Sequence, residues 1–306
     1  MKRSIFDITE DLVEKLWGVF LNRVSYARTY NQMVKRRGGR VVIDHVGFRT
    51  LNTHTGEQPG GIWGIRHLIE CLGYTAAGKY NFTKKKLKAV HFEPGKQGLP
   101  KIFVSQLEVS QLPEWVQPLF AEAVANTPYL LPDSGIELLN RLKTDRQLTQ
   151  EAADELVGHL ARYFRRPWNP PQKDTVLKLN DVSHYAAWVL LHGNAPSHFA
   201  SLVNEQHVNG WSNLETTWRS LQNAGIPMKS KVEGTAGGLL LQTATQAAKE
   251  YVTVKDDNLF LEIPWTYGYL ELIERGYDQN DHQALFQNFL EDQENHLYQM
   301  TMTLEN

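Results

Sequence analysis

The chain has a single cysteine, Cys71, and it lacks both long apolar runs and long blocks of like charge. One cysteine excludes disulfides within the chain and any zinc site built mainly from thiolates. No apolar stretch approaches the roughly 20 residues that a membrane helix needs. The residues that follow Met1 form no apolar signal region. We therefore expect a cytoplasmic protein with no membrane partner.

Charge is nearly balanced, with 32 Lys and Arg residues against 34 Asp and Glu residues. This balance gives no electrostatic basis for binding nucleic acid. Hydrophobic residues make up 42% of the 306 positions, which is enough for a large core. We expect a single large domain over residues 1–306, and the sequence does not indicate an oligomeric state.

Hydrophobic periodicity predicts a first half of the fold over residues 40–110. A helix over 9–36 precedes it and ends at Gly38 and Gly39. The elements expected within it are a strand at 41–50, a helix at 62–72, and strands at 75–82, 87–92 and 101–109. The order is strand, helix, three strands.

The same order returns over residues 181–276, after an expected helical insert at 111–180. The insert includes a helix at 149–164 with Thr149 as its N-cap. In the second half, the apolar run at 185–193 continues into 198–203 as the first strand. A helix at 213–224 and strands at 239–245, 251–254 and 267–274 follow. A C-terminal helix is expected at 280–302.

Two β-α-β-β-β modules predict an α+β fold, in which a curved mixed sheet surrounds a metal trough, with a helical insert and helical termini. The strand at 41–50 carries His45, Gly47 and Arg49 on one face, because alternate residues of a strand project the same way. A metal ligand and an anion-binding group can therefore share this wall. Charged side chains on the inward face of a core strand indicate a bound partner, because unpaired buried charge is costly. A core histidine beside a solvent-facing arginine is the alternative.

In such a fold, strands of both halves can direct side chains at one metal. The expected ligands are His45, His198 and Glu271. Alternation along 269–274 directs Glu271 inward and Glu274 outward. Two imidazoles and one carboxylate leave open positions, as in non-haem Fe(II) oxygenases, although these ligands also bind Zn, Mn, Co or Ni.

Other residues are candidates for the remaining roles at this site. A 2-oxo acid can chelate the metal, and Arg49 offers its distal anionic end a planar, bidentate partner. Asp44, Gln242 and Thr245 are candidates for orienting the ligands, and Gln242 and Thr245 also for binding substrate.

These motifs resemble the iron-dependent 2-oxoadipate dioxygenase/decarboxylase family, whose fold belongs to the vicinal oxygen chelate group. His45 and Arg49 match a metal histidine that precedes a substrate-binding arginine by four residues. Glu271 lies in a Glu-Leu-Ile-Glu-Arg-Gly segment similar to the strand that bears the family's third ligand.

The second histidine motif matches less closely. Pro196-Ser197-His198-Phe199 has serine where the family usually has asparagine, and three other histidines lie nearby in the sequence: His184, His192 and His207.

The resemblance implies a reaction of 2-oxoadipate with O2 that gives 2-hydroxyglutarate and CO2, in lysine catabolism. It implies Fe(II) as the cofactor, held by His45, His198 and Glu271, with Arg49 acting on a substrate carboxylate.

Two other functions stay open. A metal-dependent isomerase or lyase of the same fold class would need an inward base, Glu274 or Glu262. A non-catalytic protein that binds a small molecule would consume no oxygen.

Overall fold

The computed structural model describes residues 1–235, 237–277 and 284–289. The helices are α1 (Ile5–Arg23), α2 (Ser25–Arg36), α3 (Ile62–Cys71), α4 (Gln117–Val124), α5 (Asp133–Asp145), α6 (Gln150–Tyr163), α7 (Lys173–Val182), α8 (His184–His192) and α9 (Leu214–Asn223). The strands are β1 (Lys2–Ser4), β2 (Ile43–Leu51), β3 (Tyr74–Phe82), β4 (Leu87–Pro94), β5 (Lys101–Leu107), β6 (Gln147–Thr149), β7 (Pro196–Leu202), β8 (Leu240–Ala244), β9 (Lys249–Asp256), β10 (Leu259–Thr266) and β11 (Tyr269–Arg275).

Backbone contacts divide the chain into two compact units. The first consists of Met1–Val19, Gly47–Pro196 and Tyr251–Trp265. The second consists of the described residues of Phe20–Val46 and Ser197–Glu250 and those from Thr266 onward. Helix α1 and strands β2, β7, β9 and β10 contribute residues to both units.

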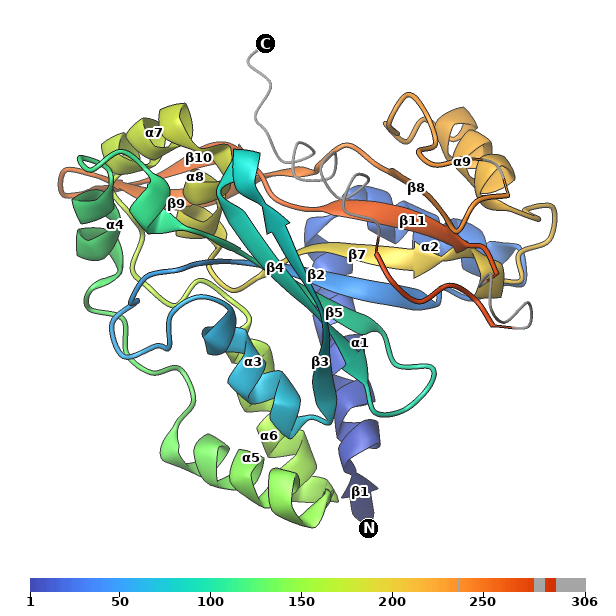
Figure 1. Cartoon of the computed structure of the whole chain (residues 1–306), viewed down its shortest axis with the longest axis horizontal. Helices are drawn as coiled ribbons and strands as arrows, with labels where there is room; N and C mark the ends of the chain where they lie inside the picture. Colours follow the sequence, from blue (N-terminus) through green and yellow to red (C-terminus); the bar gives the residue numbers. More distant parts are fainter. Residues whose placement is uncertain (236, 278–283, 290–306) are drawn as a thin grey trace. The chain divides into compact units, whose positions relative to one another are not determined.

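A mixed seven-stranded sheet has the strand order β3-β4-β5-β2-β7-β11-β8. In the first unit, β3, β4 and β5 run antiparallel side by side (Figure 1). In the second unit, β11 pairs parallel with β7 and antiparallel with β8. The predicted α+β class and mixed sheet are confirmed.

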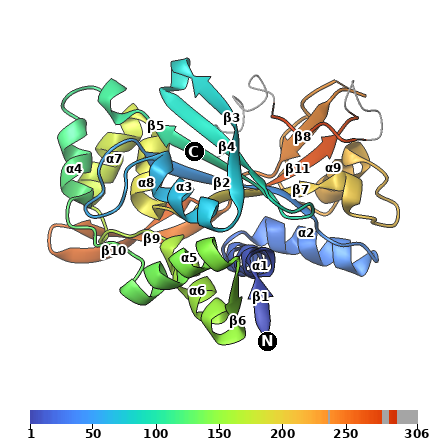
Figure 2. The same ribbon diagram turned by 60° about the horizontal axis from the view of Figure 1, so that its bottom comes forward.

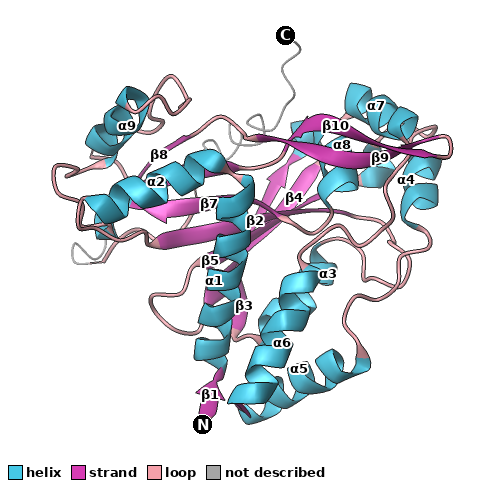
Figure 3. Cartoon of the chain, turned by 180° about the vertical axis from the view of Figure 1, so that it is seen from behind, coloured by secondary structure: helices cyan, strands magenta, loops and turns pink. Residues whose placement is uncertain are grey.

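Local sequence signals explain where several helices begin. The Thr149 side chain accepts a hydrogen bond from the Ala152 amide and starts α6, as predicted. Figure 2 shows α5 and α6 side by side in the first unit, where they contact the short β1–β6 pair. Asn213 forms a capping box with Thr216 and starts α9. Helix α9 contacts β8 and β11 of the second unit, and Figure 3 shows it near β8.

The helix predicted over 9–36 is two helices, α1 and α2. They are separated at Val24, whose backbone is extended, with φ −109° and ψ 93°. Val24 is fully buried, and β-branched residues favour extended backbone over helix. Tertiary packing of this valine therefore interrupts a pattern that is continuous in the sequence.

The apolar run at 185–193 is helix α8, so its assignment to the first strand of the second half is wrong. Every residue from Tyr185 to His192 is buried, and uniform burial removes the periodicity that distinguishes a helix from a strand. Ser183 caps this helix by accepting a hydrogen bond from the Ala186 amide. The strand itself, β7, is the later segment.

The strand predicted at 251–254 lies in β9, which pairs with β10 in a separate two-stranded sheet. The second half therefore adds β7, β11 and β8 to the large sheet. Strand β10 was not predicted. Its Leu259 and Phe260 are exposed, and it contains Pro264, a residue that disfavours strand pairing.

The helix predicted at 280–302 falls outside the described residues, apart from 284–289. Within the described ranges, every helix is too short or too polar to cross a lipid bilayer.

Candidate metal centre

The three expected metal ligands lie together in the second unit. His45 is on β2, His198 on β7 and Glu271 on β11, and all three are buried. The β7–β11 register pairs Tyr269 with His198 and Ala200 with Glu271. Adjacent positions on neighbouring strands thus bring residues that are distant in sequence onto one face.

The ligand atoms have the spacing of a mononuclear metal site. The Nε2 atoms of His45 and His198 are 3.2 Å apart. Glu271 Oε2 lies 3.5 Å from His45 Nε2 and 3.8 Å from His198 Nε2. In the described part of the chain, these three side chains form the group of His, Cys, Asp and Glu residues whose ligand atoms all lie within 4.8 Å of one another.

The Glu271 carboxylate is suited to a cation. The residue is fully buried, and among the described residues neither carboxylate oxygen takes part in a hydrogen bond. Burial, together with the charge of Asp44, raises the pKa of Glu271 although His45 and Lys229 act in the opposite direction. A buried, unsatisfied carboxylate is costly, and a divalent cation would satisfy it. The residues present therefore fit a divalent metal ion.

His45 is oriented from behind by a buried ion pair. Its Nδ1 lies 2.9 Å from Asp44 Oδ1, which directs Nε2 toward the other ligands. Arg275 Nε and Nη2 donate to the two Asp44 carboxylate oxygens at 2.6 and 2.8 Å. Such a carboxylate fixes the tautomer and raises the basicity of a metal-binding imidazole.

The same contacts change the protonation of both groups. Burial opposes the charged form of Asp44, but the charge and hydrogen bonds of Arg275 outweigh it and hold its pKa below the ordinary value. Burial also lowers the pKa of His45, but Asp44 and Glu271 outweigh this effect and raise it to about 9. The site therefore attracts positive charge.

His198 is held by its own neighbours. Ser197 Oγ lies 3.1 Å from His198 Nδ1, and the Tyr269 ring stacks on the imidazole at a centroid distance of 4.9 Å. Ser197 is the position at which the sequence departs from the family motif. Its hydroxyl can provide the polar contact to Nδ1, so serine at this position is compatible with an oriented histidine.

Two residues of this site were not assigned roles from the sequence. Arg275 belongs to the Glu-Arg-Gly motif of β11 and the residue after it, and its guanidinium also donates to the Phe286 and Asn288 carbonyls. The Phe289 ring meets His45 edge-on at 5.0 Å. The Glu-Arg-Gly motif could have drawn attention to Arg275, whereas nothing in the sequence pattern indicated Phe289.

Arg49 lies in the first unit, four residues beyond His45 on the same strand, and is 2% exposed. Its guanidinium carbon lies 4.9 Å from the Trp188 ring centroid and 5.3 Å from that of Tyr185, both on α8. Tyr185 is in turn anchored to Ser105 and to the Thr50 amide. Aromatic rings therefore support the guanidinium.

Gln242 and Thr245 have different surroundings. Gln242 pairs with Ile273 in the β8–β11 register and so shares the face that carries Glu271. The Thr245 hydroxyl donates to the Gln246 carbonyl and accepts from the Leu270 amide. Thr245 thus braces the backbone through its hydroxyl.

The remaining acidic and histidine candidates lie elsewhere. Glu274 accepts a hydrogen bond from the Leu214 amide at 2.5 Å and so supports the start of α9, and Glu262 is exposed on β10. Neither carboxylate provides the inward base that an isomerase or lyase would need. His184 and His192 belong to α8 in the first unit, and His207 is exposed. The structure therefore places His198 beside His45 and Glu271, and it places none of the other three histidines there.

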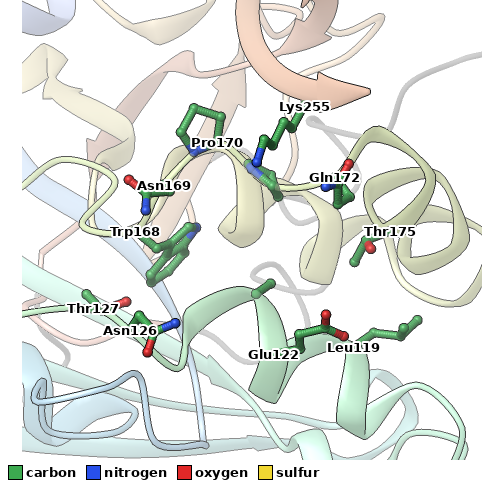
Figure 4. A pocket seen from close by; sticks show the side chains of 12 residues that line it. Leu119, Glu122, Asn126, Thr127, Trp168, Asn169, Pro170, Gln172, Thr175 and Lys255 are labelled. Carbon is green, nitrogen blue, oxygen red and sulfur yellow. The ribbon is translucent and has the colours of Figure 1, made fainter. Parts of the chain in front are cut away.

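The first unit also contains a cavity of about 230 Å³ between α4, the segment that begins at Trp168, and Lys255 of β9 (Figure 4). None of the residues assigned to the metal or the substrate from the sequence lines it.

Comparison with known proteins gives concordant results. The family model for 2-oxoadipate dioxygenase/decarboxylase matches residues 13–305. A curated rice protein (Oryza sativa subsp. japonica) named 2-oxoadipate dioxygenase/decarboxylase, chloroplastic/amyloplastic, is 24% identical over 277 residues, which cover 87% of this chain and 66% of the rice protein. The chain therefore spans just under two thirds of that relative's length.

Solved structures share the fold. A protein from Ralstonia eutropha JMP134, described as a putative glyoxalase superfamily protein, has a TM-score of 0.86 and 24% identity, covering 94% of this chain and 87% of that one. Hydroxyglutarate synthase from Oryza sativa, solved in complex with 2-oxoadipate, has a TM-score of 0.72 and 21% identity, covering 95% and 91%. The vicinal oxygen chelate-like fold expected from the sequence is confirmed, and the chain belongs to the 2-oxoadipate dioxygenase/decarboxylase family.

Proposed function

We propose that this protein is an Fe(II)-dependent dioxygenase that converts 2-oxoadipate, or a closely similar 2-oxo acid, to 2-hydroxyglutarate and CO2. The observation that carries the proposal is the fully buried Glu271 carboxylate, which lacks a hydrogen-bond partner among the described residues and lies beside the Nε2 atoms of two histidines. Membership of the family supports the substrate class and the reaction.

In this proposal, His45, His198 and Glu271 hold the iron. When bound, Fe(II) with three protein ligands supplies open positions at which a 2-oxo acid chelates and O2 reacts. Asp44 keeps a proton on His45 Nδ1 so that Nε2 is free for the metal. Ser197 orients His198 in the corresponding way.

Arg49 binds a substrate carboxylate. Its planar guanidinium can donate two parallel hydrogen bonds, which fix the orientation of a carboxylate as well as neutralise it. The Tyr185 and Trp188 rings contact the guanidinium and help to hold it in place. Alternate residues of a strand share a face, which supports a common role for His45 and Arg49 on β2.

The proposed reaction balances without a further reductant. Carbon 1 of 2-oxoadipate leaves as CO2, carbon 2 becomes a carboxylate, and carbon 3 gains a hydroxyl group. The two oxygen atoms of O2 end in that carboxylate and that hydroxyl, while the electrons come from the carbon 1 to carbon 2 bond and from the C3–H bond. A supply of 2-oxoadipate from lysine catabolism would give this reaction its place in metabolism.

Oxygen uptake by Fe(II)-loaded protein tests the proposal. We expect 2-oxoadipate to cause uptake with an equal amount of 2-hydroxyglutarate formed. His45→Ala should abolish uptake, and Glu274→Gln, a change to a carboxylate on the other face of the same strand as Glu271, should retain it. Absence of uptake with any 2-oxo acid would refute the dioxygenase and favour a protein that only binds small molecules.

A further inference from the structure

Gln242 is a buried glutamine whose two amide atoms have unequal surroundings. The residue is fully buried on β8, and its Nε2 donates to Glu233 Oε2 at 3.5 Å. Among the described residues, its Oε1 accepts no hydrogen bond. Leaving a buried acceptor unsatisfied costs about 1–3 kcal/mol. This acceptor therefore points to a ligand that carries a donor.

Another glutamine of the second unit shows the usual outcome of burial. Gln206 Nε2 donates to Thr217 Oγ1 at 2.8 Å, and its Oε1 accepts from the Tyr30 hydroxyl at 3.1 Å. Both of its amide atoms are satisfied within the protein. Gln242 differs because one atom is satisfied by the protein and the other is not.

The identity of the unsatisfied atom is fixed by charge. Glu233 is ion-paired with Lys229, with Nζ 2.7 Å from Oε1, and both side chains are largely buried. A carboxylate accepts hydrogen bonds and cannot donate them, so the Gln242 amide must present its NH2 group to Glu233. The Lys229–Glu233 pair thereby holds Oε1 of Gln242 in the opposite direction.

That direction leads toward β11, the strand that carries Glu271. The segment containing Glu233 lies along the outer edge of β8, where a bridge pairs Glu233 with Gln242. On the other side of β8, β11 pairs Ile273 with Gln242 and Glu271 with Ala244. The Gln242 side chain is thus a diagonal neighbour of Glu271, within about 7–8 Å at the backbone. The residue directly beside Glu271 on β8, Ala244, is small and places no long side chain next to its carboxylate.

The chemistry of the proposed reaction supplies the missing donor. The reacting end of a 2-oxo acid carries only acceptors, a keto oxygen and a carboxylate, so it cannot satisfy Oε1. The product carries a new hydroxyl group beside a carboxylate. We infer that Gln242 Oε1 accepts a hydrogen bond from the hydroxyl of a 2-hydroxy acid bound at the metal centre, an inference that rests on the proposed function. Gln242 is thus a residue that recognises product, and Glu233 is the positioning residue behind it.

The test compares two acids that differ only in the oxygen at carbon 2. Binding of 2-hydroxyglutarate and of 2-oxoglutarate is measured by calorimetry on Mn(II)-loaded protein under nitrogen, where no turnover occurs. Gln242→Leu removes one hydrogen bond to the ligand hydroxyl. Its affinity for 2-hydroxyglutarate should therefore fall by about fivefold or more, while its affinity for 2-oxoglutarate should change by less than about twofold.

Two further variants separate recognition from structure. Glu233→Gln frees the Gln242 amide to rotate. The preference for 2-hydroxyglutarate over 2-oxoglutarate, which Gln242→Leu should remove, should therefore be partly lost in Glu233→Gln as well. Gln246→Leu changes a glutamine just beyond the same strand and should leave both affinities unchanged. If a water molecule on the metal is the donor to Gln242 instead, Gln242→Leu will lower the affinity for both acids equally.

Equal weakening of both acids, or of neither, overturns the inference and leaves the proposed function standing. If neither acid binds the metal-loaded wild-type protein, the inference is overturned, and oxygen uptake with 2-oxoadipate decides the proposed function separately.

Discussion

Asp44→Asn should both destabilise the protein and weaken its hold on metal. Asp44 and Arg275 form a buried bidentate pair, with side chains 3% and 1% exposed. The substitution removes the negative charge and leaves the Arg275 guanidinium buried without its counterion. Breaking a buried pair in this way costs about 3–5 kcal/mol in the free energy of unfolding.

The same change affects His45. An asparagine side chain in place of Asp44 can present only one oxygen, for which Arg275 and His45 Nδ1 would compete. Loss of such an orienting contact typically lowers metal affinity by about 10–100-fold. Denaturant unfolding of the metal-free protein measures the first effect, and competition with a metal-binding dye measures the second.

Asp256→Asn is the matched control. Asp256 pairs with Lys173 at 3.3 Å, but the two side chains are 48% and 38% exposed. An exposed pair contributes less than about 1 kcal/mol, so this variant should unfold nearly as the wild type does and bind metal equally well. The reasoning is refuted if Asp44→Asn is as mild as Asp256→Asn in both assays.

Three further outcomes are expected. Glu271→Gln should abolish metal binding in a dialysis assay while circular dichroism shows a retained fold, whereas Glu274→Gln should keep the metal; the reverse pattern would contradict the strand phase. Arg49→Lys should raise the Kd for 2-oxoadipate by about tenfold or more with little change in metal content, because lysine cannot form the bidentate contact; a loss of metal equal to that in His45→Ala would contradict the substrate role. Burial opposes the charged form of Glu93, but hydrogen bonds from His91 and Lys101 outweigh it and hold its pKa below the ordinary value. The stabilising contribution of Glu93 is therefore present above its unfolded pKa of about 4.3 and is lost as the pH falls through the folded value, so the stability difference between wild type and Glu93→Gln should shrink on acidification; a difference that stays constant with pH would argue against this contribution.

Much of the candidate site was accessible from the sequence because strand alternation is strict. The phase of 269–275 separates Glu271 from Glu274, and the structure directs the first to the two histidines and the second to α9. The same alternation placed His45 on a face with Arg49. Period-two patterns of this kind survive folding because a slip of one residue would exchange the buried and exposed faces.

Other features depend on contacts between distant parts of the chain. Arg275 and Asp44 are 231 residues apart, so their pairing leaves no local trace in the sequence. The helical pattern of the sequence is continuous through Val24, and only tertiary packing gives this residue an extended backbone. The uniformly apolar α8 gives no period, and only the Ser183 cap marks its start.

The most direct test of the account is a reaction under ¹⁸O2 with Fe(II)-loaded protein and 2-oxoadipate, followed by mass spectrometry of the 2-hydroxyglutarate. The account predicts label in both the hydroxyl and one carboxylate of the product, with none of this product formed by Glu271→Gln. Unlabelled product, or product formed equally well by Glu271→Gln, would contradict a dioxygenase built on this metal centre.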